Sequence, residues 1–372
     1  MVIPYLKRIG GYEKQAVSLS RYLKSKGINV LIVTDTPIRE LGALKDEFDI
    51  HWAGFLPEFP RHPVTSLNSM LWFSIKNYFG FSLFHSHAFC WLSGSAALSG
   101  KILGKKSIVK AASEGDVEHL ATSKLLDDKI YFSWLKNSDR FLAISSNIKK
   151  ELLRYEIKEI NISLIPNAVD TELFKPVNSE EKIILRKELG IEDKFVITYA
   201  GRLDKNKGVE TAIFALEKIL KEKENPLLLI LGDGPEKINL TERVSTMNLG
   251  ERVLFKGFVD DVASYLKSSD IFIFPSLREG NPNAVLEAMS CGIPVVANSI
   301  EGIKDIISDG VEGILVYSKS PDEFAEKVLC LSRNSSLRIN MGKEARKKIL
   351  TRFGSKAVVD RYLELYGKLI SQ

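Results

Sequence analysis

Short apolar runs alternate with amphipathic segments along the whole chain, and this alternation predicts its secondary structure. In the second half, the apolar runs predict strands at Phe195–Ala200, Leu227–Leu231, Val253–Phe255, Ile271–Pro275, Pro294–Ala297 and Gly313–Val316. The segments between them carry apolar residues at helical spacing, most clearly in Val209–Lys223, Glu236–Leu249 and Asn283–Cys291. Strands separated by helices indicate right-handed βαβ units and a parallel sheet.

The first half shows the same alternation. Its predicted strands are Val2–Tyr5, Val30–Thr34, Phe48–His51, Leu83–His85, Ser107–Lys110, Phe141–Ile144 and Ser163–Ile165. Its predicted helices include Tyr12–Lys26, Thr65–Tyr78 and Asn147–Tyr155. The rhythm breaks around Asp170–Asn178, and an amphipathic segment, Ser355–Ile370, follows near the C-terminus. We therefore expect an α/β protein with two doubly wound, Rossmann-like domains, 1–172 and 173–353, and a C-terminal helix in 354–372.

Length and composition agree with this organisation. A chain of 372 residues fits two domains, and 45% hydrophobic with 27% charged residues is ordinary for a globular protein. These values exclude a disordered tail, a collagen-like repeat and a disulfide miniprotein. The three cysteines, Cys90, Cys291 and Cys330, are too scattered for a disulfide framework or a Cys-rich zinc site. We expect them to be buried thiols in a reducing compartment.

The formal charge of +5 belongs entirely to the first half. Met1–Lys175 has 23 Lys and Arg against 18 Asp and Glu, whereas Pro176–Gln372 has 29 of each. A basic half can bind nucleic acid, anionic lipid or a phosphorylated substrate, and composition does not choose among them.

The N-terminus lacks the features of a signal peptide. The charge-free run 77–100 is long enough to span a bilayer, but its His, Ser and Gly content favours a strand, a turn and a helix.

The stretch Ile50–Trp91 is poor in charge and rich in aromatic residues. These are Trp52, Phe55, Phe59, Trp72, Phe73, Phe79 and Phe81. Beside basic residues, such a stretch is typical of a peripheral contact with a membrane surface. It is also typical of side chains that fill a hydrophobic core, and we favour that interpretation for most of these residues.

The clearest candidate chemistry follows the predicted strand Ile271–Pro275. A turn at 280–283 leads into a helix, whose N-terminus would offer free N–H groups to an anion. Glu279 precedes the turn and Glu287 lies inside the helix, too far apart for a paired acid/base dyad. Two acids at separate depths suit contacts to two hydroxyl-bearing parts of one ligand, although ordinary surface carboxylates would look the same.

A second cluster follows the predicted strand Phe195–Ala200. In the glycine-flanked loop 201–208, Arg202 can clamp two phosphate oxygens and Lys207 supplies a point charge, unless the loop is simply a solvated basic turn. The segment Gly232–Pro235 resembles the start of a dinucleotide loop, but Lys237 stands at the third glycine position.

Two further observations bear on phosphate and metal binding. Gly10 and Gly11 precede a predicted helix and would let a phosphate approach the backbone. The sequence has no Asp-x-Asp pair, no P-loop, no Gly-x-Ser-x-Gly elbow and no His-Glu-x-x-His motif. His85 and His87 would share one face of a strand, but no third ligand lies nearby in sequence. We therefore expect neither a metal site nor a cofactor.

Taken in order, these segments resemble the family 4 retaining glycosyltransferases of the GT-B fold. The matching segments are Gly10–Glu13, Ile165–Phe174, Ala200–Gly208, Gly232–Pro235, Glu279–Glu287 and Ala288–Ala297. The resemblance covers nearly the whole chain. It implies two Rossmann-like domains that face each other across a cleft, with a C-terminal helix that returns to the first domain.

The resemblance also implies residue roles. Arg202 and Lys207 would hold the diphosphate of a nucleotide-sugar donor and stabilise the leaving phosphate, which removes the need for a metal ion. Glu279 would contact the donor sugar, Glu287 the ribose hydroxyls, and Gly11 the phosphates. The implied catalytic residues are Arg202, Lys207 and Glu279. The implied donor-binding residues are Gly11, Gly201, Arg202, Lys207, Gly232, Glu279, Gly280, Asn281, Pro282, Asn283, Ala284, Val285 and Glu287.

The sequence departs from the family pattern at three places. Family members often carry a His-Gly pair after the strand matching Ser107–Lys110, and here Glu114 or a neighbour stands there. The usual Asn-Gly-Val-Asp reads Asn-Ala-Val-Asp at 167–170. The first strand looks short, so we expect further residues upstream of Met1.

The resemblance implies a metal-independent, retaining transfer of a hexose-type sugar from a nucleotide-diphosphate sugar to an acceptor hydroxyl, in cell-surface polysaccharide or glycolipid synthesis. The alternatives are another GT-B activity, such as a phosphorylase or a nucleotide-sugar epimerase, and a non-catalytic GT-B scaffold. The expected partners are a nucleotide sugar and a saccharide or lipid-linked acceptor, but no nucleic acid. We expect a cytoplasmic protein, with peripheral membrane contact through the first domain at the cytoplasmic face.

Overall fold

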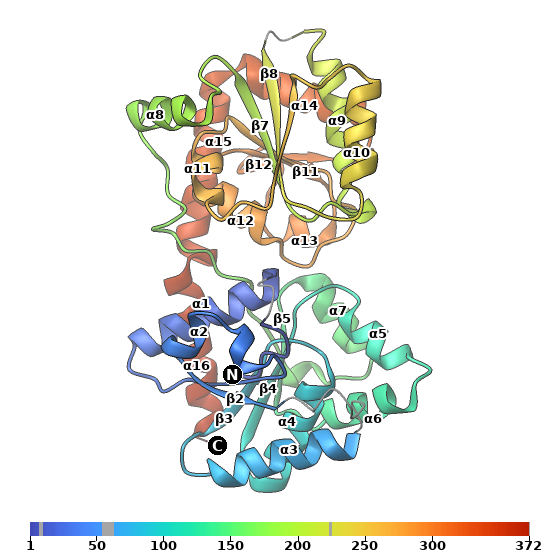
Figure 1. Cartoon of the computed structure of the whole chain (residues 1–372), viewed down its shortest axis with the longest axis vertical. Helices are drawn as coiled ribbons and strands as arrows, with labels where there is room; N and C mark the ends of the chain where they lie inside the picture. Colours follow the sequence, from blue (N-terminus) through green and yellow to red (C-terminus); the bar gives the residue numbers. More distant parts are fainter. Residues whose placement is uncertain (7–9, 54–62, 223–224, 372) are drawn as a thin grey trace. The chain divides into compact units, whose positions relative to one another are not determined.

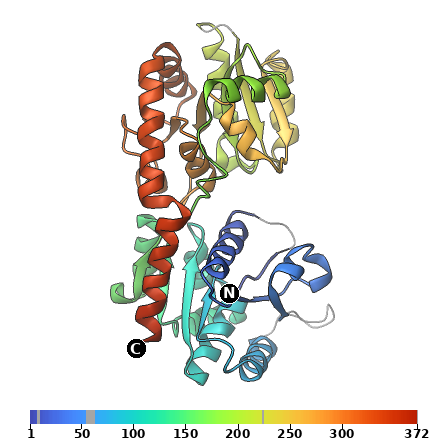
Figure 2. The same ribbon diagram turned by 90° about the vertical axis from the view of Figure 1, so that its left-hand side faces the viewer.

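The computed structural model describes residues 1–6, 10–53, 63–222 and 225–371. These residues form two compact units (Figures 1 and 2). Unit 1 consists of Met1–Asn167 together with Val358–Gln372, and unit 2 is the continuous segment Ala168–Ala357. The boundaries predicted from the sequence lie at 172 and 353.

Unit 2 contains a six-stranded parallel sheet in the order β12-β11-β10-β7-β8-β9. The strands are β7 (Phe195–Ala200), β8 (Pro226–Leu231), β9 (Val253–Gly257), β10 (Ile271–Phe274), β11 (Val295–Asn298) and β12 (Gly313–Val316). The chain adds β8 and β9 on one side of β7 and β10 to β12 on the other, so the switch point lies between β7 and β10. Doubly wound sheets bind ligands at such a point. All six strands occur where the apolar runs predict them.

Helices lie on both faces of this sheet (Figure 1). They are α8 (Ser179–Leu189), α9 (Val209–Ile219), α10 (Lys237–Thr246), α11 (Val262–Lys267), α12 (Asn283–Ser290), α13 (Glu301–Lys304), α14 (Pro321–Arg333) and α15 (Ser335–Lys348), with short helical turns η3 (Lys205–Lys207) and η4 (Ile349–Phe353). Because helices cover both faces, β8 and β10 are buried along their whole length. This is why they read as continuous apolar runs rather than as alternating ones.

Unit 1 has parallel strands in two hydrogen-bonded groups, β1-β2 and β3-β4-β5-β6. They are β1 (Leu31–Thr34), β2 (Asp49–Trp52), β3 (Leu83–Ser86), β4 (Lys106–Ala111), β5 (Arg140–Ala143) and β6 (Ile162–Leu164). The helices are α1 (Gly11–Ser25), α2 (Leu44–Glu47), α3 (Pro63–Lys76), α4 (Trp91–Leu103), α5 (Asp116–Thr122), α6 (Leu126–Leu135) and α7 (Ser146–Arg154), with η1 (Ile38–Glu40) and η2 (Glu159–Asn161).

The first residues of the chain join these two groups of strands. The Val2 amide donates to the His85 carbonyl at 2.8 Å, and the Ile3 amide donates to the Val33 carbonyl at 2.9 Å. The regular strand predicted for Val2–Tyr5 is wrong, because only isolated bridges form at Val2. Pro4 has no N–H to donate to the β3 side, which accounts for the early end of the pairing there, although its carbonyl accepts from the Asp35 amide at 3.3 Å.

The C-terminal helix α16 (Ser355–Ile370) supplies part of the core of unit 1 (Figure 2). Its apolar face is buried, as the amphipathic pattern predicts. The Tyr366 hydroxyl lies 2.6 Å from Nδ1 of His85 in β3, and both side chains are buried. The helix therefore packs on the N-terminal unit, as the resemblance implies.

The aromatic stretch of unit 1 divides between core and surface. Phe73 is buried, whereas Trp72 is 59% exposed and Phe79 is 99% exposed. Phe55 and Phe59 lie outside the described residues. Neither of the two interpretations of this stretch holds for all of its members, because α3 buries one face and leaves the other open.

The cysteines and the helix lengths bear on two other expectations. Cys291 is buried and Cys90 is half-buried, but Cys330 is exposed, so the expectation of three buried thiols is wrong at that position. Cys330 lies on α14 next to the buried Leu329 and Leu331, on the side of the helix that faces away from the core. Within the described ranges, no helix is both long and apolar enough to cross a bilayer.

Candidate functional site

The loops that follow β7 and β10 bring two charged side chains of unit 2 together. Lys207, in η3, donates from Nζ to Oε1 of Glu279 at 2.7 Å, although the residues are 72 positions apart. Only 25% of the lysine side chain and 12% of the glutamate side chain are exposed. A short, charge-assisted hydrogen bond at this depth holds both groups in place at the carboxyl edge of the sheet.

Glycines allow the loops after β7 and β8 to meet backbone to backbone. A Cβ on Gly232 would lie 2.0 Å from the Gly201 carbonyl oxygen, and a Cβ on Gly234 would lie 2.3 Å from the Leu203 carbonyl oxygen. Gly232 also has φ +137°, a conformation that favours glycine. The Leu203 amide donates to the Asp233 carbonyl at 3.0 Å. These contacts fix the backbone on both sides of Arg202.

Arg202 itself is not part of this packed arrangement. Its side chain is 72% exposed, and the nearest carboxylate is Asp204, 4.0 Å from Nε. Its carbonyl oxygen accepts a hydrogen bond from the Tyr199 hydroxyl at 3.1 Å. Burial raises the pKa of Tyr199, and the nearby carboxylates Glu279 and Asp204 add to the effect. The structure therefore anchors the Arg202 backbone and leaves its guanidinium open to solvent.

The turn before α12 is buried and is held by residues that the sequence analysis did not select. Asn298, at the end of β11, donates from Nδ2 to the carbonyl oxygens of Pro275 and Ser276 at 2.7 and 3.2 Å. A Cβ on Gly302 would lie 2.2 Å from the Glu279 carbonyl oxygen. A polar residue directly after an apolar run is the only sequence signal that could have indicated Asn298.

The predicted donor-binding residues around α12 occupy different depths. Gly280, Asn281 and Pro282 are buried, and Asn283 and Ala284 are half-buried in the first turn of the helix. The Val285 side chain belongs to the hydrophobic core of unit 2, so only its backbone could contact a ligand. Glu287 is half-buried one turn into the helix.

Gly11 is the one predicted donor-binding residue that lies in unit 1. It opens α1, with Gly10 as the N-cap. A Cβ on Gly10 would lie 2.7 Å from Oε2 of the buried Glu13, so glycine leaves room for that carboxylate. Burial raises the pKa of Glu13.

Unit 1 also contains a buried polar cluster beneath α16. The rings of His85 and His87 are 4.2 Å apart, and Lys110 donates from Nζ to Oδ1 of Asn167 at 2.9 Å. Burial lowers the pKa of Lys110 to about 7 and lowers the pKa of both histidines well below the usual value. Over the described ranges, no group of three or more His, Cys, Asp or Glu is placed to hold a metal ion.

The loop after β4 stands where family members often carry a histidine. Glu114 is half-buried there. Two residues later, Asp116 accepts hydrogen bonds at Oδ2 from the amides of Ala112 and Ser113, at 3.2 and 2.8 Å. Burial raises the pKa of Asp116 to about 6. The loop is thus shaped by a carboxylate, and the structure places no histidine in it.

Family models match both units. The model described as Glycosyltransferase Family 4 matches residues 9–173, and the model described as Glycosyl transferases group 1 matches residues 181–348. Together they cover nearly all of unit 1 before α16 and most of unit 2. The chain belongs to the family 4 glycosyltransferases, which have the GT-B fold.

Relatives and solved structures agree with this assignment. The chain is 29% identical to N-acetyl-alpha-D-glucosaminyl L-malate synthase of Bacillus anthracis, over 75% of this chain and 71% of that protein. It is 32% identical to UDP-Gal:alpha-D-GlcNAc-diphosphoundecaprenol alpha-1,3-galactosyltransferase of Escherichia coli, over 65% of each. The matches therefore span about two thirds of these relatives.

The fold closely matches that of HepE from Anabaena, solved in complex with UDP. The TM-score is 0.85 over 99% of both chains, at 18% identity. The sucrose-phosphate synthase of Thermosynechococcus elongatus gives a TM-score of 0.77 at 22% identity. At these identities the likeness establishes the fold alone.

Proposed function

We propose that the protein is a retaining glycosyltransferase that moves a hexose-type sugar from a nucleotide-diphosphate sugar to an acceptor hydroxyl, without a metal ion. The observation that carries this proposal is the pairing of Lys207 with Glu279 at the carboxyl edge of the unit 2 sheet. This edge is where a doubly wound sheet binds its ligand. The pairing places a cation for phosphate beside a carboxylate for sugar hydroxyls.

The geometry of the loops supports a role for each cation. Arg202 and Lys207 bind the donor diphosphate and stabilise the negative charge that develops on the leaving phosphate, so that cations of the chain take the place of a metal. Arg202 can turn toward the ligand at little cost because no close partner holds its guanidinium. The α12 N-terminus, at Asn283–Val285, offers backbone N–H groups to the same anion.

Carboxylates provide the remaining contacts to the donor. Glu279, held by Lys207, accepts hydrogen bonds from the sugar hydroxyls, and Glu287 on α12 accepts from the ribose hydroxyls. Gly201 and Gly232 support the phosphate-binding backbone indirectly, because a Cβ at either position would clash with the Tyr199 hydroxyl or the Gly201 carbonyl oxygen and push the loops apart. Gly11 of unit 1 is assigned to the donor phosphates by family resemblance. HepE, which shares the fold, was solved with UDP and with UDP-glucose, which supports a uridine diphosphate sugar as the first donor to test.

We further propose that the acceptor is a lipid-linked saccharide of a cell-surface polysaccharide or glycolipid pathway. Relatives from Escherichia coli and Campylobacter jejuni are named for diphosphoundecaprenol-linked acceptors. Unit 1 exposes Trp72, Ile75 and Phe79 around the end of α3, and the Lys76 ammonium lies 5.1 Å from the centre of the Trp72 ring. Aromatic and basic residues on one surface suit peripheral contact at the cytoplasmic face of a membrane.

Acceptor-dependent turnover tests the activity. The protein is incubated with a panel of nucleotide sugars, with and without undecaprenyl-diphosphate-linked saccharides, and free nucleoside diphosphate is measured. We expect its release only when donor and acceptor are both present, with unchanged rates in EDTA and an α-anomeric product from an α-linked donor. Diphosphate release without acceptor, an inverted product or loss of activity in EDTA would contradict the corresponding part of the proposal.

Vesicle sedimentation tests the membrane contact. Phe79→Ser should weaken binding to phosphatidylglycerol vesicles, because the Phe79 side chain is 99% exposed in unit 1. Ile160→Ser is the matched control, since Ile160 is 79% exposed in the same unit but lies in a different element, η2. Equal binding of the two variants would remove the membrane contact from the proposal.

A further inference from the structure

Unit 2 has a pocket of about 600 Å³ at the edge of the sheet away from the candidate site. Ser269 and Asp270, directly before β10, and Ile293 and Pro294, directly before β11, line its floor. Residues of α8 and α15 line its walls. The pocket therefore lies at the amino ends of the strands, whereas the candidate donor loops follow their carboxyl ends.

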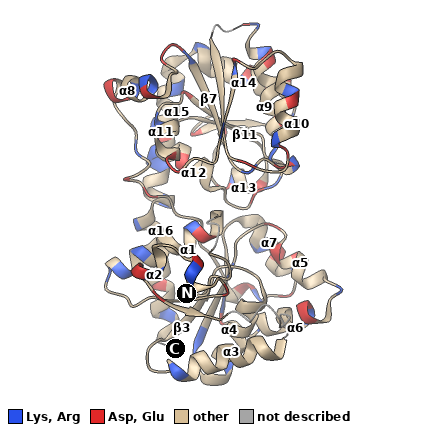
Figure 3. Ribbon diagram, in the orientation of Figure 1, with Lys and Arg blue, Asp and Glu red and all other residues tan. Residues whose placement is uncertain are grey.

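The pocket is strongly basic. Six of its lining residues are cationic: Lys182, Lys267, Arg338, Lys343, Arg346 and Lys347. Among the described residues that line it, Asp270 is the only acid. The second half of the sequence is neutral as a whole, so this concentration of positive charge is local. Figure 3 shows the Lys and Arg positions in blue.

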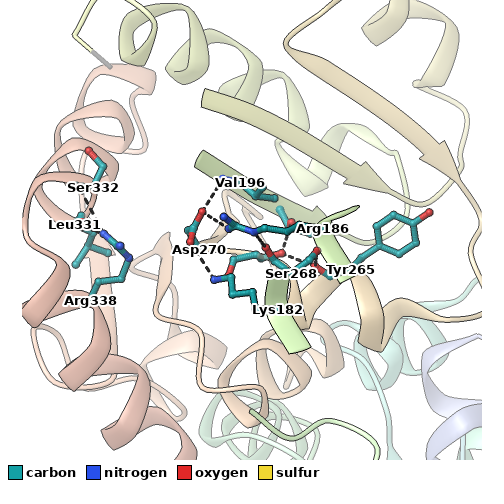
Figure 4. Close-up of polar contacts among 11 residues, drawn as sticks. Lys182, Arg186, Val196, Tyr265, Ser268, Asp270, Leu331, Ser332 and Arg338 are labelled. Carbon is teal, nitrogen blue, oxygen red and sulfur yellow. Dashed lines mark hydrogen bonds and ion pairs between the residues drawn. The ribbon is translucent and has the colours of Figure 1, made fainter. Parts of the chain in front are cut away.

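The charge of Asp270 is already balanced by Lys182 of the pocket lining and by Arg186, which also lies on α8 (Figure 4). Lys182 donates to its Oδ1 at 3.0 Å, and Arg186 donates to its Oδ2 at 2.6 Å. The Val196 amide donates to the same carboxylate at 2.9 Å. Burial would raise the pKa of Asp270, but the charges of Lys182 and Arg186 outweigh it and lower the pKa. This acid cannot also neutralise the remaining cations.

Neutral oxygen acceptors hold the two pocket arginines in place, and no carboxylate is hydrogen-bonded to either guanidinium among the described residues. Arg346 donates to the carbonyl oxygens of Thr171, Phe174 and Ser290 at 2.8–2.9 Å. Arg338 donates to the Leu331 carbonyl at 2.7 Å (Figure 4). A guanidinium that is fixed before a ligand arrives loses little side-chain entropy on binding.

Two lysines complete the positive lining. Lys267 ends α11 and Lys343 lies on α15, and neither forms an ion pair with any carboxylate in the part of the chain that the structure describes. Lys343 is exposed and Lys267 is half-buried. Both can therefore turn toward an anion without giving up an existing partner.

We infer that this pocket is a second anion-binding site, which takes a phosphate-bearing ligand independently of the donor site. Fixed guanidiniums and two unpaired ammonium groups suit a phosphate group. The one acid of the lining does not repel it strongly, because the Asp270 carboxylate is already paired with cations. The apolar side chains of Ile293 and Ile339 also line the pocket and leave room for an organic portion of the ligand. The phosphate can come from a soluble phosphorylated molecule or from the headgroup of an anionic lipid.

Calorimetric titration with inorganic pyrophosphate tests the soluble source. The protein carries Arg202→Ala and Lys207→Ala in this arm, so that the donor loops do not bind the probe. We expect binding to persist in this background and to weaken at least tenfold when Lys267→Glu and Lys343→Glu are added, because two attractive charges become repulsive. The milder pair Lys267→Gln and Lys343→Gln should give a smaller loss, and its melting temperature should equal that of the parent.

Sedimentation with phosphatidylcholine vesicles, with and without phosphatidylglycerol, tests the lipid source in the otherwise native protein. The matched control is Lys221→Glu with Lys327→Glu, which makes the same charge change in unit 2 at residues outside the pocket lining. A loss confined to the pocket variants supports the inference, and the arm in which it occurs identifies the source. The inference fails if the pocket and control variants behave alike in both arms.

Discussion

The Lys207–Glu279 ion pair permits a quantitative test of how the candidate site is built. Lys207→Ala removes the ammonium and leaves the Glu279 carboxylate, which is 12% exposed, without its partner. Glu279→Gln removes the opposite charge and keeps the shape of the side chain. The double variant removes both charges, so the three proteins and the parent form a double-mutant cycle.

The expected magnitude follows from the geometry of the pair. Two unit charges at the 2.7 Å separation of Nζ and Oε1 attract each other by about 3 kcal/mol at an effective dielectric constant of about 40. Desolvation and lost side-chain entropy offset part of this, because both side chains are mostly buried. We expect a coupling free energy of about 1–2 kcal/mol in the stability of the ligand-free protein.

Urea denaturation of the four proteins measures this coupling. Lys205→Ala is the control, because Lys205 is an exposed residue of the same helical turn and should change stability by less than about 0.5 kcal/mol. Additive effects of the two single variants, within about 0.5 kcal/mol, would refute the preorganised pair.

The same variants separate a structural role from a catalytic one. Each single substitution at Lys207 or Glu279 should lower kcat/KM by about 10²- to 10³-fold, as expected when a group that stabilises the transition state is lost. Lys205→Ala should keep the parental rate. Parental rates in both site variants would refute their catalytic assignment even if the stability coupling is found.

Three further predictions concern stability. Gly232→Ala should destabilise unit 2 by about 2–4 kcal/mol because its Cβ would lie 2.0 Å from the Gly201 carbonyl oxygen, whereas Gly250→Ala, with open space around it, should be near neutral in thermal denaturation. The pKa of Lys110 is about 7 in the folded protein, below its value in the unfolded chain, so the free energy of unfolding should rise between pH 7 and about pH 10. In Lys110→Met, urea denaturation at the same pH values should show a smaller rise. Asp270→Asn should lower stability at pH 7, because the pKa of Asp270 is lowered in the folded state; the difference from the parent should shrink as the pH falls below about 4, and a difference that stays constant down to pH 2 would contradict this.

The sequence predicts the unit 2 sheet well because its strands are covered on both faces. The bounds of β7 and β12 agree with the predicted Phe195–Ala200 and Gly313–Val316. The first strand was predicted less well, since apolar character at Val2–Tyr5 does not reveal that regular pairing is limited to bridges at Val2. Hydrophobicity alone also could not separate the buried Phe73 from the exposed Trp72, because that depends on which face of α3 meets the core.

The candidate site was predicted as a set of residue types rather than as a geometry. Arg202, Lys207 and Glu279 were selected from their loops and from family resemblance, but the contact between Lys207 and Glu279 spans 72 residues and requires the folded sheet. Asn298 and Gly302 were missed because they act on the backbone of the turn before α12 and have no motif of their own. A close approach of two backbone segments is visible in the sequence only as a glycine, and many glycines have other causes.

The attachment of α16 to unit 1 has a consequence for biosynthesis. A ribosome delivers residues in order, so unit 2, which is continuous from Ala168 to Ala357, is fully synthesised before Val358–Gln372 emerges. Until then, His85 lacks its Tyr366 partner and the surface that α16 covers stays open to water. Unit 2 can thus finish folding first, although it comes second in the sequence, and the N-terminal unit stays accessible to chaperones and proteases until Val358–Gln372 has been synthesised.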